Sequence, residues 1–404
     1  MRKIGVIGGG AAGFFTAIQC KLHDASVQVV ILEKSAKILS KVKISGGGRC
    51  NVTNVESDPI RLASKYPRGE RLLKKAFREF NTTDTRDFFE QRNVPLVVQE
   101  DGCVFPQSQN SQSIIDCFTK TCQQLDITIR LNQQIQEIQQ TESGFVLQVN
   151  GETESFDKLI ICTGGSPKLS GLKWLEELGQ PVITPYPSLF TFNMPQNPIC
   201  KLMGIVVENA LVRIPGTKLL AKGPLLITHW GMSGPAILVL SAWGARILAE
   251  KEYTFECSVN WTGEVNEELI RQKLTQIQSN NLDKKVVKYG QFGLSSRLWE
   301  FIVLKSEINP EKTWRTLSKK EFNRLVNNLL NDTYSVTGKT TFKEEFVTAG
   351  GVDLGYINFK TMESKTIPNL YFAGEILDID GITGGFNFQA AWTTAFLAAK
   401  GATA

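Results

Sequence analysis

The sequence predicts an α/β fold built around a parallel sheet, and its apolar pattern is the main reason. A short apolar strand at residues 4–7 runs directly into a glycine-rich turn and a helical stretch, and a second strand follows at 27–32. Further buried-strand runs stand at 159–162 and 369–373. Continuous apolar strands that alternate with helices are typical of a parallel sheet covered on both faces. With 404 residues, the chain is long enough for roughly two or three domains.

The composition excludes several classes of protein. With 42% hydrophobic residues, 21% charged residues and a mean hydropathy of -0.11, the chain is neither disordered nor collagen-like nor a coiled coil. The net charge of +5, from 45 basic and 40 acidic residues, does not by itself indicate nucleic-acid binding. We expect Lys284, Lys285, Lys288, Lys319 and Lys320 to form a solvated face.

The eight cysteines show no ligand spacing, because no two of them form a Cys-x-x-Cys pair. We therefore expect reduced thiols, no disulfide and no metal site. Arg2 and Lys3 precede an apolar stretch, as in a signal peptide, but the glycines within that stretch indicate a nucleotide-binding turn instead. No apolar run of about 18 residues occurs, so we expect a cytoplasmic protein without a membrane span.

Gly8, Gly10 and Gly13 form a Gly-x-Gly-x-x-Gly pattern between the first strand and the predicted helix at 12–22. In such a turn the first glycine permits a tight bend, the second a close approach to pyrophosphate, and the third close packing of helix on sheet. Glu33 follows Gly13 by 20 residues, at the end of the second strand, where a carboxylate can bind both hydroxyls of a ribose. This pattern predicts a dinucleotide site without a 2′-phosphate beside Glu33.

A second glycine cluster, at residues 45–54, favours FAD over NAD. Its three consecutive glycines let another stretch of backbone approach a ligand, and Arg49 and Asn51 supply donors for phosphate or for the flavin edge. An NAD dehydrogenase has no need of such an element at this distance from the first turn. We therefore expect a bulky, extended cofactor.

Two later segments fit the same cofactor. Thr163-Gly164-Gly165 ends a buried strand, and the meander predicted before it, at 133–139 and 145–149, places Ile135 beside the adenine. Near the other end, the strand at 369–373 leads through Gly374 and the loop 381–387 into a helix at about 388–400. The positive end of that helix would stabilise the negative charge of a reduced flavin.

Together these segments resemble a known family, the bacterial NAD(P)/FAD-dependent oxidoreductases that include proteins called aminoacetone oxidases. The resemblance covers nearly the whole chain. Its carriers are residues 8–13, 44–54, 163–165, 228–235, 348–352 and 371–389. It implies a Rossmann-like FAD-binding domain with a parallel sheet and a β-meander, interrupted by a β-barrel-like substrate domain that carries a small helical insertion.

The resemblance also implies which residues contact FAD. It places Ala11 and Ala12 at the pyrophosphate and Glu33 at the adenosine ribose. The family usually has Gly-Arg-Lys where this chain has Leu39-Ser40-Lys41, so only Lys41 is carried over. The residues predicted to bind the cofactor are Gly8, Gly10, Ala11, Ala12, Gly13, Glu33, Lys34, Lys41, Ser45, Gly46, Gly47, Arg49, Cys50, Asn51, Ile135, Thr163, Gly164, Gly374, Glu375, Asp378, Gly384, Gly385, Phe386 and Asn387.

The middle of the chain lacks nucleotide motifs and looks inserted. We expect residues 1–188 and 343–404 to form the FAD-binding domain, 189–262 and 332–342 a β-rich substrate domain, and 263–331 a helical insertion.

Four residues carry local predictions outside the glycine motifs. Ser318 and Glu321 form a capping box that starts a helix, and Ser233 is expected to cap another. His229 is a candidate for the substrate pocket, but a lone histidine is more often a structural hydrogen-bonding group. No catalytic side chain is otherwise identified.

Cys50 has two interpretations. It is either a reactive thiol beside the flavin or a residue that packs against the cofactor through its backbone. Disulfide reductases pair two cysteines that lie close together in sequence, and this chain has no such pair. We favour packing.

The leading hypothesis for function is an FAD-dependent oxidoreductase that transfers a hydride between flavin N5 and a small organic substrate or NAD(P)H. Because the chain has one Gly-x-Gly-x-x-Gly unit, NAD(P)H would bind only transiently. An FAD-dependent RNA-modifying enzyme is the alternative, disfavoured by the weak net charge, and a non-enzymatic redox sensor is a third. Whether the enzyme is an oxidase or a reductase, and its oligomeric state, are left open.

Overall fold

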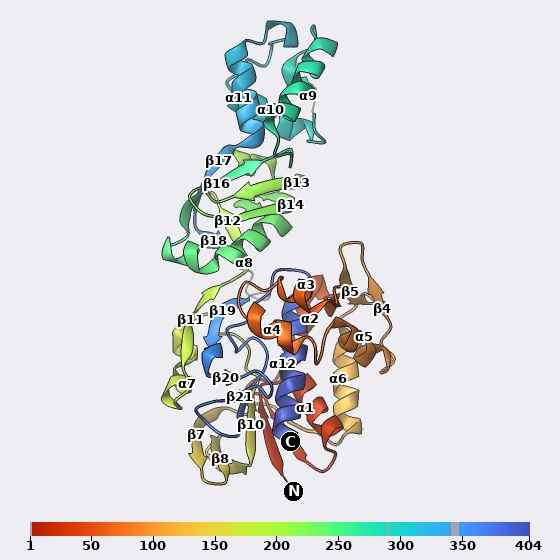
Figure 1. Cartoon of the computed structure of the whole chain (residues 1–404), viewed down its shortest axis with the longest axis vertical. Helices are drawn as coiled ribbons and strands as arrows, with labels where there is room; N and C mark the ends of the chain where they lie inside the picture. Colours follow the sequence, from red (N-terminus) through yellow and green to blue (C-terminus); the bar gives the residue numbers. More distant parts are fainter. Residues whose placement is uncertain (1, 289–290, 341–346) are drawn as a thin grey trace. The chain divides into compact units, whose positions relative to one another are not determined.

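The computed structural model describes residues 2–288, 291–340 and 347–404. The chain divides into two compact units. Unit 1 comprises Met1–Ser188 and Phe342–Ala404, and unit 2 comprises Leu189–Thr341. Unit 1 is thus assembled from two separate segments, and in Figure 1 the red and blue ends of the chain lie together within it. The expected boundary at residues 342 and 343 lies outside the described residues.

The core of unit 1 is a seven-stranded sheet in the order β20-β21-β22-β10-β1-β2-β6. Its five strands from β22 to β6 are parallel, as predicted, and two short antiparallel strands extend one edge. The strands are β1 (Lys3–Ile7), β2 (Gln28–Leu32), β6 (Thr128–Arg130), β10 (Lys158–Ile161), β20 (Ile357–Asn358), β21 (Glu363–Ser364) and β22 (Leu370–Phe372). In register, Ile7 lies beside Leu32 and Ile161. The central strands are buried almost throughout, which explains their continuous apolar sequence.

Two long helices, α1 (Ala11–His23) and α12 (Phe386–Thr403), pack against each other in unit 1 (Figure 1). Both are buried on most of their surface, and the rings of Phe15 and Trp392 lie 5.3 Å apart between them. The indole N–H of Trp392 donates to the carbonyl oxygen of Val52 at 2.9 Å. The apolar core of unit 1 is continuous from the sheet to these helices.

The predicted meander is confirmed and has a third strand. β7 (Ile135–Thr141), β8 (Gly144–Val149) and β9 (Glu152–Phe156) form an antiparallel sheet, of which the sequence indicated the first two. The remaining helices and strands of unit 1 are α2 (Ser40–Gly48), β3 (Thr53–Asn54), α3 (Pro59–Ala63), α4 (Glu70–Ala76), α5 (Thr82–Glu90), β4 (Leu96–Val98), β5 (Cys103–Pro106), α6 (Gln112–Gln124), α7 (Lys173–Glu177), β11 (Val182–Pro187) and β19 (Thr348–Val352). β11 and β19 pair with each other where the chain leaves unit 1 and returns to it.

Unit 2 contains an antiparallel sheet in the order β17-β16-β13-β14-β15-β12-β18. Its strands are β12 (Thr191–Asn193), β13 (Val206–Arg213), β14 (Leu220–Thr228), β15 (Gly231–Ser233), β16 (Thr254–Asn260), β17 (Asp332–Thr337) and β18 (Lys339–Thr340). The two ends of this order, β17 and β18, are separated in sequence only by Gly338. The sheet therefore curls back on itself, which gives the barrel-like form that the resemblance implied.

One predicted helix cap in unit 2 is wrong. Ser233 lies in β15, where it pairs with Leu226, and Gly234 is the N-cap residue of α8 (Pro235–Glu250). Gly234 has a φ of 95° and no room for a side chain, since a β-carbon there would lie 2.9 Å from the carbonyl oxygen of Pro224. Pro235, at the start of the helix, has no N–H that would need an acceptor, and α8 begins without a side-chain cap.

The helical part of unit 2 consists of α9 (Glu267–Asn280), α10 (Ser296–Lys305) and α11 (Lys319–Leu330). The predicted capping box at the start of α11 is confirmed: the Ser318 side chain accepts from the Glu321 N–H, and the Glu321 carboxylate accepts from the Ser318 N–H. The buried residues of this helical part and those of the curled sheet form one apolar core.

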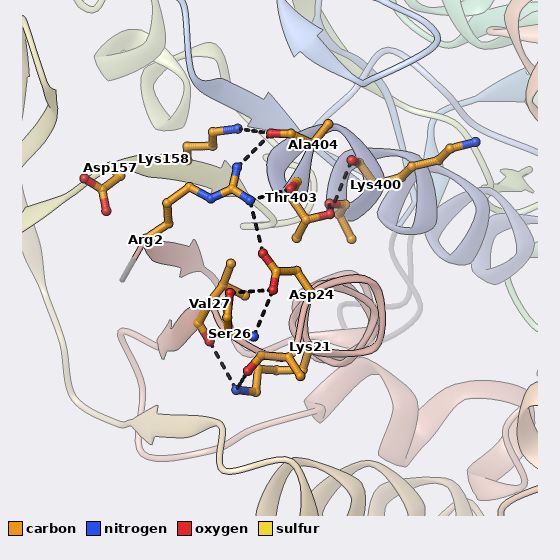
Figure 2. A network of polar contacts seen from close by, with 12 residues as sticks. Arg2, Lys21, Asp24, Ser26, Val27, Asp157, Lys158, Lys400, Thr403 and Ala404 are labelled. Carbon is orange, nitrogen blue, oxygen red and sulfur yellow. Dashed lines mark hydrogen bonds and ion pairs between the residues drawn. The ribbon is translucent and has the colours of Figure 1, made fainter.

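A polar network joins the first strand of unit 1 to the last helix (Figure 2). The Arg2 guanidinium donates to the main-chain oxygens of Thr403 and Ala404, both at 2.7 Å, and pairs with Asp24 at 3.1 Å. Lys158 donates to the same oxygen of Ala404 at 3.4 Å. Cations at the end of α12 bind carbonyl groups that have no partner within the helix, and this fixes the helix against β1 and β10.

Among the described helices, none is both long and apolar enough to cross a membrane.

Candidate functional site

Four parallel strands of unit 1 end at the same edge of the sheet. The Gly8 N–H donates to Leu32, the Cys162 N–H donates to Ile7, and the Ala373 N–H donates to Ile161. The loops after β1, β2, β10 and β22 therefore leave the sheet side by side. This carboxyl edge is where nucleotides bind in sheets of this type.

The glycine turn after β1 is as tight as the sequence predicted. A β-carbon on Gly8 would lie 2.4 Å from the Cys162 carbonyl oxygen, and one on Gly13 would lie 1.9 Å from the Gly8 carbonyl oxygen. A β-carbon on Gly10, by contrast, would meet no protein atom within 4 Å. Gly10 caps α1 without any side-chain hydrogen bond. The start of α1 is thus open at Gly10, beside the half-buried Ala11 and the buried Ala12, and the helix can offer its free N–H groups to an anion there.

Glu33 is held beside this turn by two backbone donors. Its carboxylate accepts from the Gly9 N–H at 2.7 Å and from the Ser35 N–H at 2.8 Å. Its neighbour Lys34 is exposed. The Glu33 carbonyl oxygen accepts from the Gln133 N–H at 2.8 Å, which brings the start of the meander, and with it the half-buried Ile135, to the same end of the sheet.

The second glycine cluster ends α2 in an irregular turn. Gly46, Gly47 and Gly48 have φ values of 57°, 68° and 84°, a region that disfavours other residues, and Ser45 interrupts the helix just before them. The Arg49 guanidinium lies 4.3 Å from the centre of the Phe105 ring and donates to Gly46 at 3.1 Å.

This cluster lies directly against the start of α12. With its amide oriented to match its neighbours, Asn51 accepts from the Gly385 N–H at 3.0 Å and donates to Thr53 at 2.8 Å. The Asn54 amide donates to Gly384 at 3.0 Å. A β-carbon on Gly385 would lie 2.3 Å from the Thr53 carbonyl oxygen. The predicted cofactor-binding segments at 45–51 and 384–387 are therefore neighbours, although more than 300 residues separate them.

Phe386 and Asn387 stabilise the loop before α12. Tyr66 donates its hydroxyl to the Phe386 carbonyl oxygen at 2.6 Å. The Asn387 amide accepts from the Gly381 N–H at 2.8 Å and donates to the Gly381 carbonyl oxygen at 2.9 Å. The Asn387 side chain is therefore engaged with its own loop.

The loop after β22 joins the same edge. A β-carbon on Gly374 would lie 2.7 Å from that of Ala12, so this loop touches the start of α1. Glu375 pairs with Lys41 at 2.5 Å and accepts from the Thr348 N–H at 3.1 Å. Further along, the Asp378 carboxylate accepts from the Gly350 N–H at 2.8 Å.

Three further residues complete the placement of the predicted site. Thr163 and Gly164 follow β10, exposed and half-buried respectively. His229 lies in unit 2, exposed at the tight turn between β14 and β15, with its ring 4.2 Å from that of Trp230. The cofactor candidates all belong to unit 1, and His229 does not.

A buried polar cluster that the sequence did not indicate supports the loop 378–387. Arg68 forms a two-point contact with Asp380, and both side chains also contact the Ser188 hydroxyl. The Asp380 side chain is completely buried and that of Arg68 is 9% exposed. Burial raises the pKa of Asp380, and Arg68 and then Ser188 oppose this rise. Because 312 residues separate Arg68 from Asp380, no sequence pattern indicates the pair.

Cys50 fits packing better than redox chemistry. It is buried, and burial raises the pKa of its thiol to about 12. The thiolate, which is the reactive form, is therefore scarce near neutral pH. In the described residues, no group of three or more His, Cys, Asp or Glu side chains could hold a metal ion.

The donors and the open space of this edge fit FAD. The open cradle at Gly10 can admit a pyrophosphate, Glu33 can bind a ribose, and residues 45–51 with 384–386 form a second wall made largely of backbone. Fold and site together define an FAD-dependent oxidoreductase of the Rossmann type.

The chain belongs to the HI0933-like Rossmann-domain family, whose model matches residues 2–401. It is 29% identical to the ribosomal RNA dihydrouridine synthase of Escherichia coli, over 98% of this chain and 96% of that protein. It is 27% identical to the 3-dehydro-bile acid delta(4,6)-reductase of Clostridium scindens, over 100% of this chain and 99% of that one. In fold it is similar to a 3-ketosteroid delta1-dehydrogenase from Sterolibacterium denitrificans, with a TM-score of 0.52, 11% identity and 99% of each chain covered.

Replacing Gly10 by alanine tests the cradle. The new methyl group meets no protein atom, so we expect an intact fold, but it occupies the space assigned to the pyrophosphate. FAD binding should weaken roughly tenfold or more. The ratio of flavin to protein absorbance, with thermal melting of the apoprotein, measures both effects. Gly355→Ala, in the short helix at Leu354–Tyr356 and away from the glycine turns, is the matched control; equal flavin content in the two variants would contradict the assignment.

Removing Arg68 should destabilise unit 1. Arg68→Ala leaves a buried carboxylate without its cation, which costs about 3 kcal/mol or more. Adding Asp380→Asn should recover part of that loss, measured by chemical unfolding. Without Arg68 the folded-state pKa of Asp380 rises further, so the variant loses most stability at neutral pH, and its deficit narrows as the pH falls and the carboxyl protonates in both states. A pH-independent deficit would contradict this account.

Thiol labelling tests the interpretation of Cys50. Seven of the eight cysteines are buried and Cys200 is partly exposed. We expect iodoacetamide to alkylate Cys200 first in the native protein at pH 8, and Cys50 only after unfolding. Peptide mass mapping gives the order of labelling. Rapid native labelling of Cys50, faster than that of Cys200, is the result that would restore a reactive thiol.

Proposed function

We propose that this protein reduces a carbon–carbon double bond conjugated to a carbonyl group, that its substrate is uridine in RNA, and that NAD(P)H is the reductant. The single observation that carries the proposal is the similarity to an enzyme named for making dihydrouridine in ribosomal RNA, which extends over 98% of this chain. Because both units take part in that match, the similarity is not confined to the cofactor fold.

The names of the two relatives describe one class of chemistry. Uridine becomes dihydrouridine when the double bond next to its ring carbonyl is saturated. A delta(4,6)-reductase that acts on a 3-dehydro compound likewise saturates double bonds in conjugation with a ketone. A hydride added at the far carbon of such a bond places negative charge on the carbonyl oxygen, and a proton completes the reduction. The likeness to both proteins supports this reaction class more strongly than it supports either substrate.

The residues of unit 1 have distinct proposed roles. Gly8 to Gly13 and the start of α1 bind the pyrophosphate of FAD, and Glu33 binds its adenosine ribose. Gly384 and Gly385 lie at the positive end of α12, which favours negative charge on the reduced ring. When bound, FAD accepts a hydride from NAD(P)H and delivers a hydride to the substrate.

Unit 2 is proposed as the substrate domain, with its curled sheet and its helical part. The exposed His229 stays a candidate for contact with substrate. Because the chain has one Gly-x-Gly-x-x-Gly unit, NAD(P)H has no dinucleotide-binding domain of its own and binds only long enough to reduce the flavin.

A small unsaturated ketone is the second candidate substrate. It is favoured by the likeness to the bile acid reductase, which covers 100% of this chain and 99% of that enzyme.

Anaerobic turnover tests the proposal. The purified yellow protein is mixed with NADH or NADPH, and loss of the visible flavin absorbance reports reduction. An unmodified ribosomal RNA transcript is then added, and its digested nucleosides are analysed by mass spectrometry. We expect the flavin colour to return together with a uridine derivative heavier by two hydrogen atoms. The Gly10→Ala variant, depleted of FAD, is the negative control.

Two results would contradict the proposal. If a 3-keto-4-ene steroid restores the flavin colour and the RNA does not, the small-molecule substrate replaces RNA. If only oxygen restores it, the protein is an oxidase.

A further inference from the structure

A groove on the helical part of unit 2 has an unusual lining. It has a volume of about 760 Å³ and lies along α11, with the end of α10 at its side; Figure 1 shows these helices next to each other. Its lining consists of lysine, arginine and asparagine alone, with four cations and no acidic residue. Such a lining offers hydrogen-bond donors and positive charge to a ligand, and no acidic group that would repel an anion.

The surplus positive charge of the chain is concentrated in this region. Residues 263–331 contain twelve Lys or Arg and eight Asp or Glu, a net charge of +4 out of +5 for the whole chain. The rest of the chain therefore has a net charge of only +1. A localised basic surface on an otherwise neutral protein is typical of a contact with a polyanion.

Two of the four cations in the groove are already neutralised. Lys305 pairs with the buried carboxylate of Asp332, and Arg324 pairs with Glu307 at 2.8 Å. The guanidinium of Arg324 is further fixed by the Ser306 carbonyl oxygen at 2.9 Å. Lys305 and Arg324 therefore already have partners within the protein.

Lys319 and Lys320 are the cations left for a ligand. Both are exposed, and among the described residues neither forms an ion pair. The one acidic residue in the same helical turn, Glu321, is occupied by Lys312 at 2.7 Å and by Ser318, which together lower the pKa of its carboxyl to about 2. Glu321 therefore does not compensate the two lysines.

The position of the two lysines is unfavourable for helix stability. They occupy the first turn of α11, where the helix dipole is positive and acidic residues would be stabilising. Their charges add to that dipole and raise the local positive potential. The placement is disadvantageous for the isolated helix and favourable for binding an anion.

The asparagines add neutral donors and acceptors along the groove. Asn327 is exposed on the face of α11 two turns after Lys320, and its amide can bind a sugar hydroxyl or a phosphate oxygen. No aromatic side chain lines the groove, so bases have nothing on which to stack. The chemistry fits a sugar–phosphate backbone bound without regard to sequence.

We propose that this groove binds the phosphate backbone of the substrate RNA. Lys319 and Lys320 neutralise phosphates of the RNA. Asn327, farther along α11, contacts the RNA backbone. The inference rests on the proposed function, because it takes RNA as the substrate. It adds a site for that RNA on a part of unit 2 that carries no nucleotide motif.

RNA binding by the full-length, FAD-loaded protein tests the groove. The probe is a fluorescently labelled, unmodified ribosomal RNA transcript, and anisotropy gives the affinity at several salt concentrations. We expect Lys319→Ala/Lys320→Ala to bind roughly tenfold more weakly than wild type at low salt. The slope of log K against log salt should become shallower by about 1.4, or about 0.7 for each phosphate that the variant no longer neutralises.

The matched control is Lys218→Ala/Lys222→Ala, which removes two exposed lysines of the same unit, Lys218 in the loop before β14 and Lys222 within β14. It should bind RNA and turn over like wild type. Thermal melting checks that both double variants fold. Alanine has a high helix propensity, so the substitutions at the start of α11 should preserve the helix.

Three outcomes separate the groove from the proposed function. Selective loss of affinity in the Lys319/Lys320 variant supports the groove. Equal affinity in both variants, with dihydrouridine still formed, overturns the groove and leaves the reductase in place. A wild-type protein that neither binds nor reduces the transcript overturns both.

Discussion

Gly13 has no room for a side chain, and the architecture of unit 1 depends on that fact. A β-carbon there would lie 1.9 Å from the Gly8 carbonyl oxygen, so α1 rests directly on the turn that leaves β1. This close contact leaves open space beside Gly10 at the start of α1, and α12 packs along α1. Gly374 approaches Ala12 closely from the other segment of the unit. Close approach between main chains, more than any single polar side chain, shapes the edge of the sheet where we propose that FAD binds.

The second wall of the site depends on buried hydrogen bonds between distant segments. Asn51 and Asn54 bond the residues before α12, and the buried Gln389 of that helix accepts from Thr53 and from Thr85. Buried polar groups of this kind are costly unless each finds its partner, so they select one arrangement of the segments they join. The Arg68 and Asp380 cluster acts similarly on the loop between β22 and α12. The geometry of the proposed cofactor site therefore depends on segments from both parts of unit 1.

Sequence reasoning succeeded where the cause was local. The strand-turn-helix at 4–22, the meander and the helix at the C-terminal end follow from apolar periodicity and glycine spacing, and the structure confirms them. It failed where the cause was a contact across the chain. The cap expected at Ser233 was wrong because pairing with β14 holds that residue in a strand. The charge of Lys319 and Lys320 could be read from the sequence, but the groove they line could not, because it depends on how α10 packs against α11.

The insertion of unit 2 as one uninterrupted segment has a consequence for synthesis. As the chain leaves the ribosome, residues 189–341 emerge complete while unit 1 still lacks β22 and α12. Unit 2 can therefore fold early, because its core needs no later residue. Unit 1 must wait with part of its sheet uncovered, and the wall at Gly384 and Gly385 forms last. A product truncated before Gly384 would lack residues 384–387, which we propose to contact FAD, so we expect it to be colourless even when unit 2 is folded.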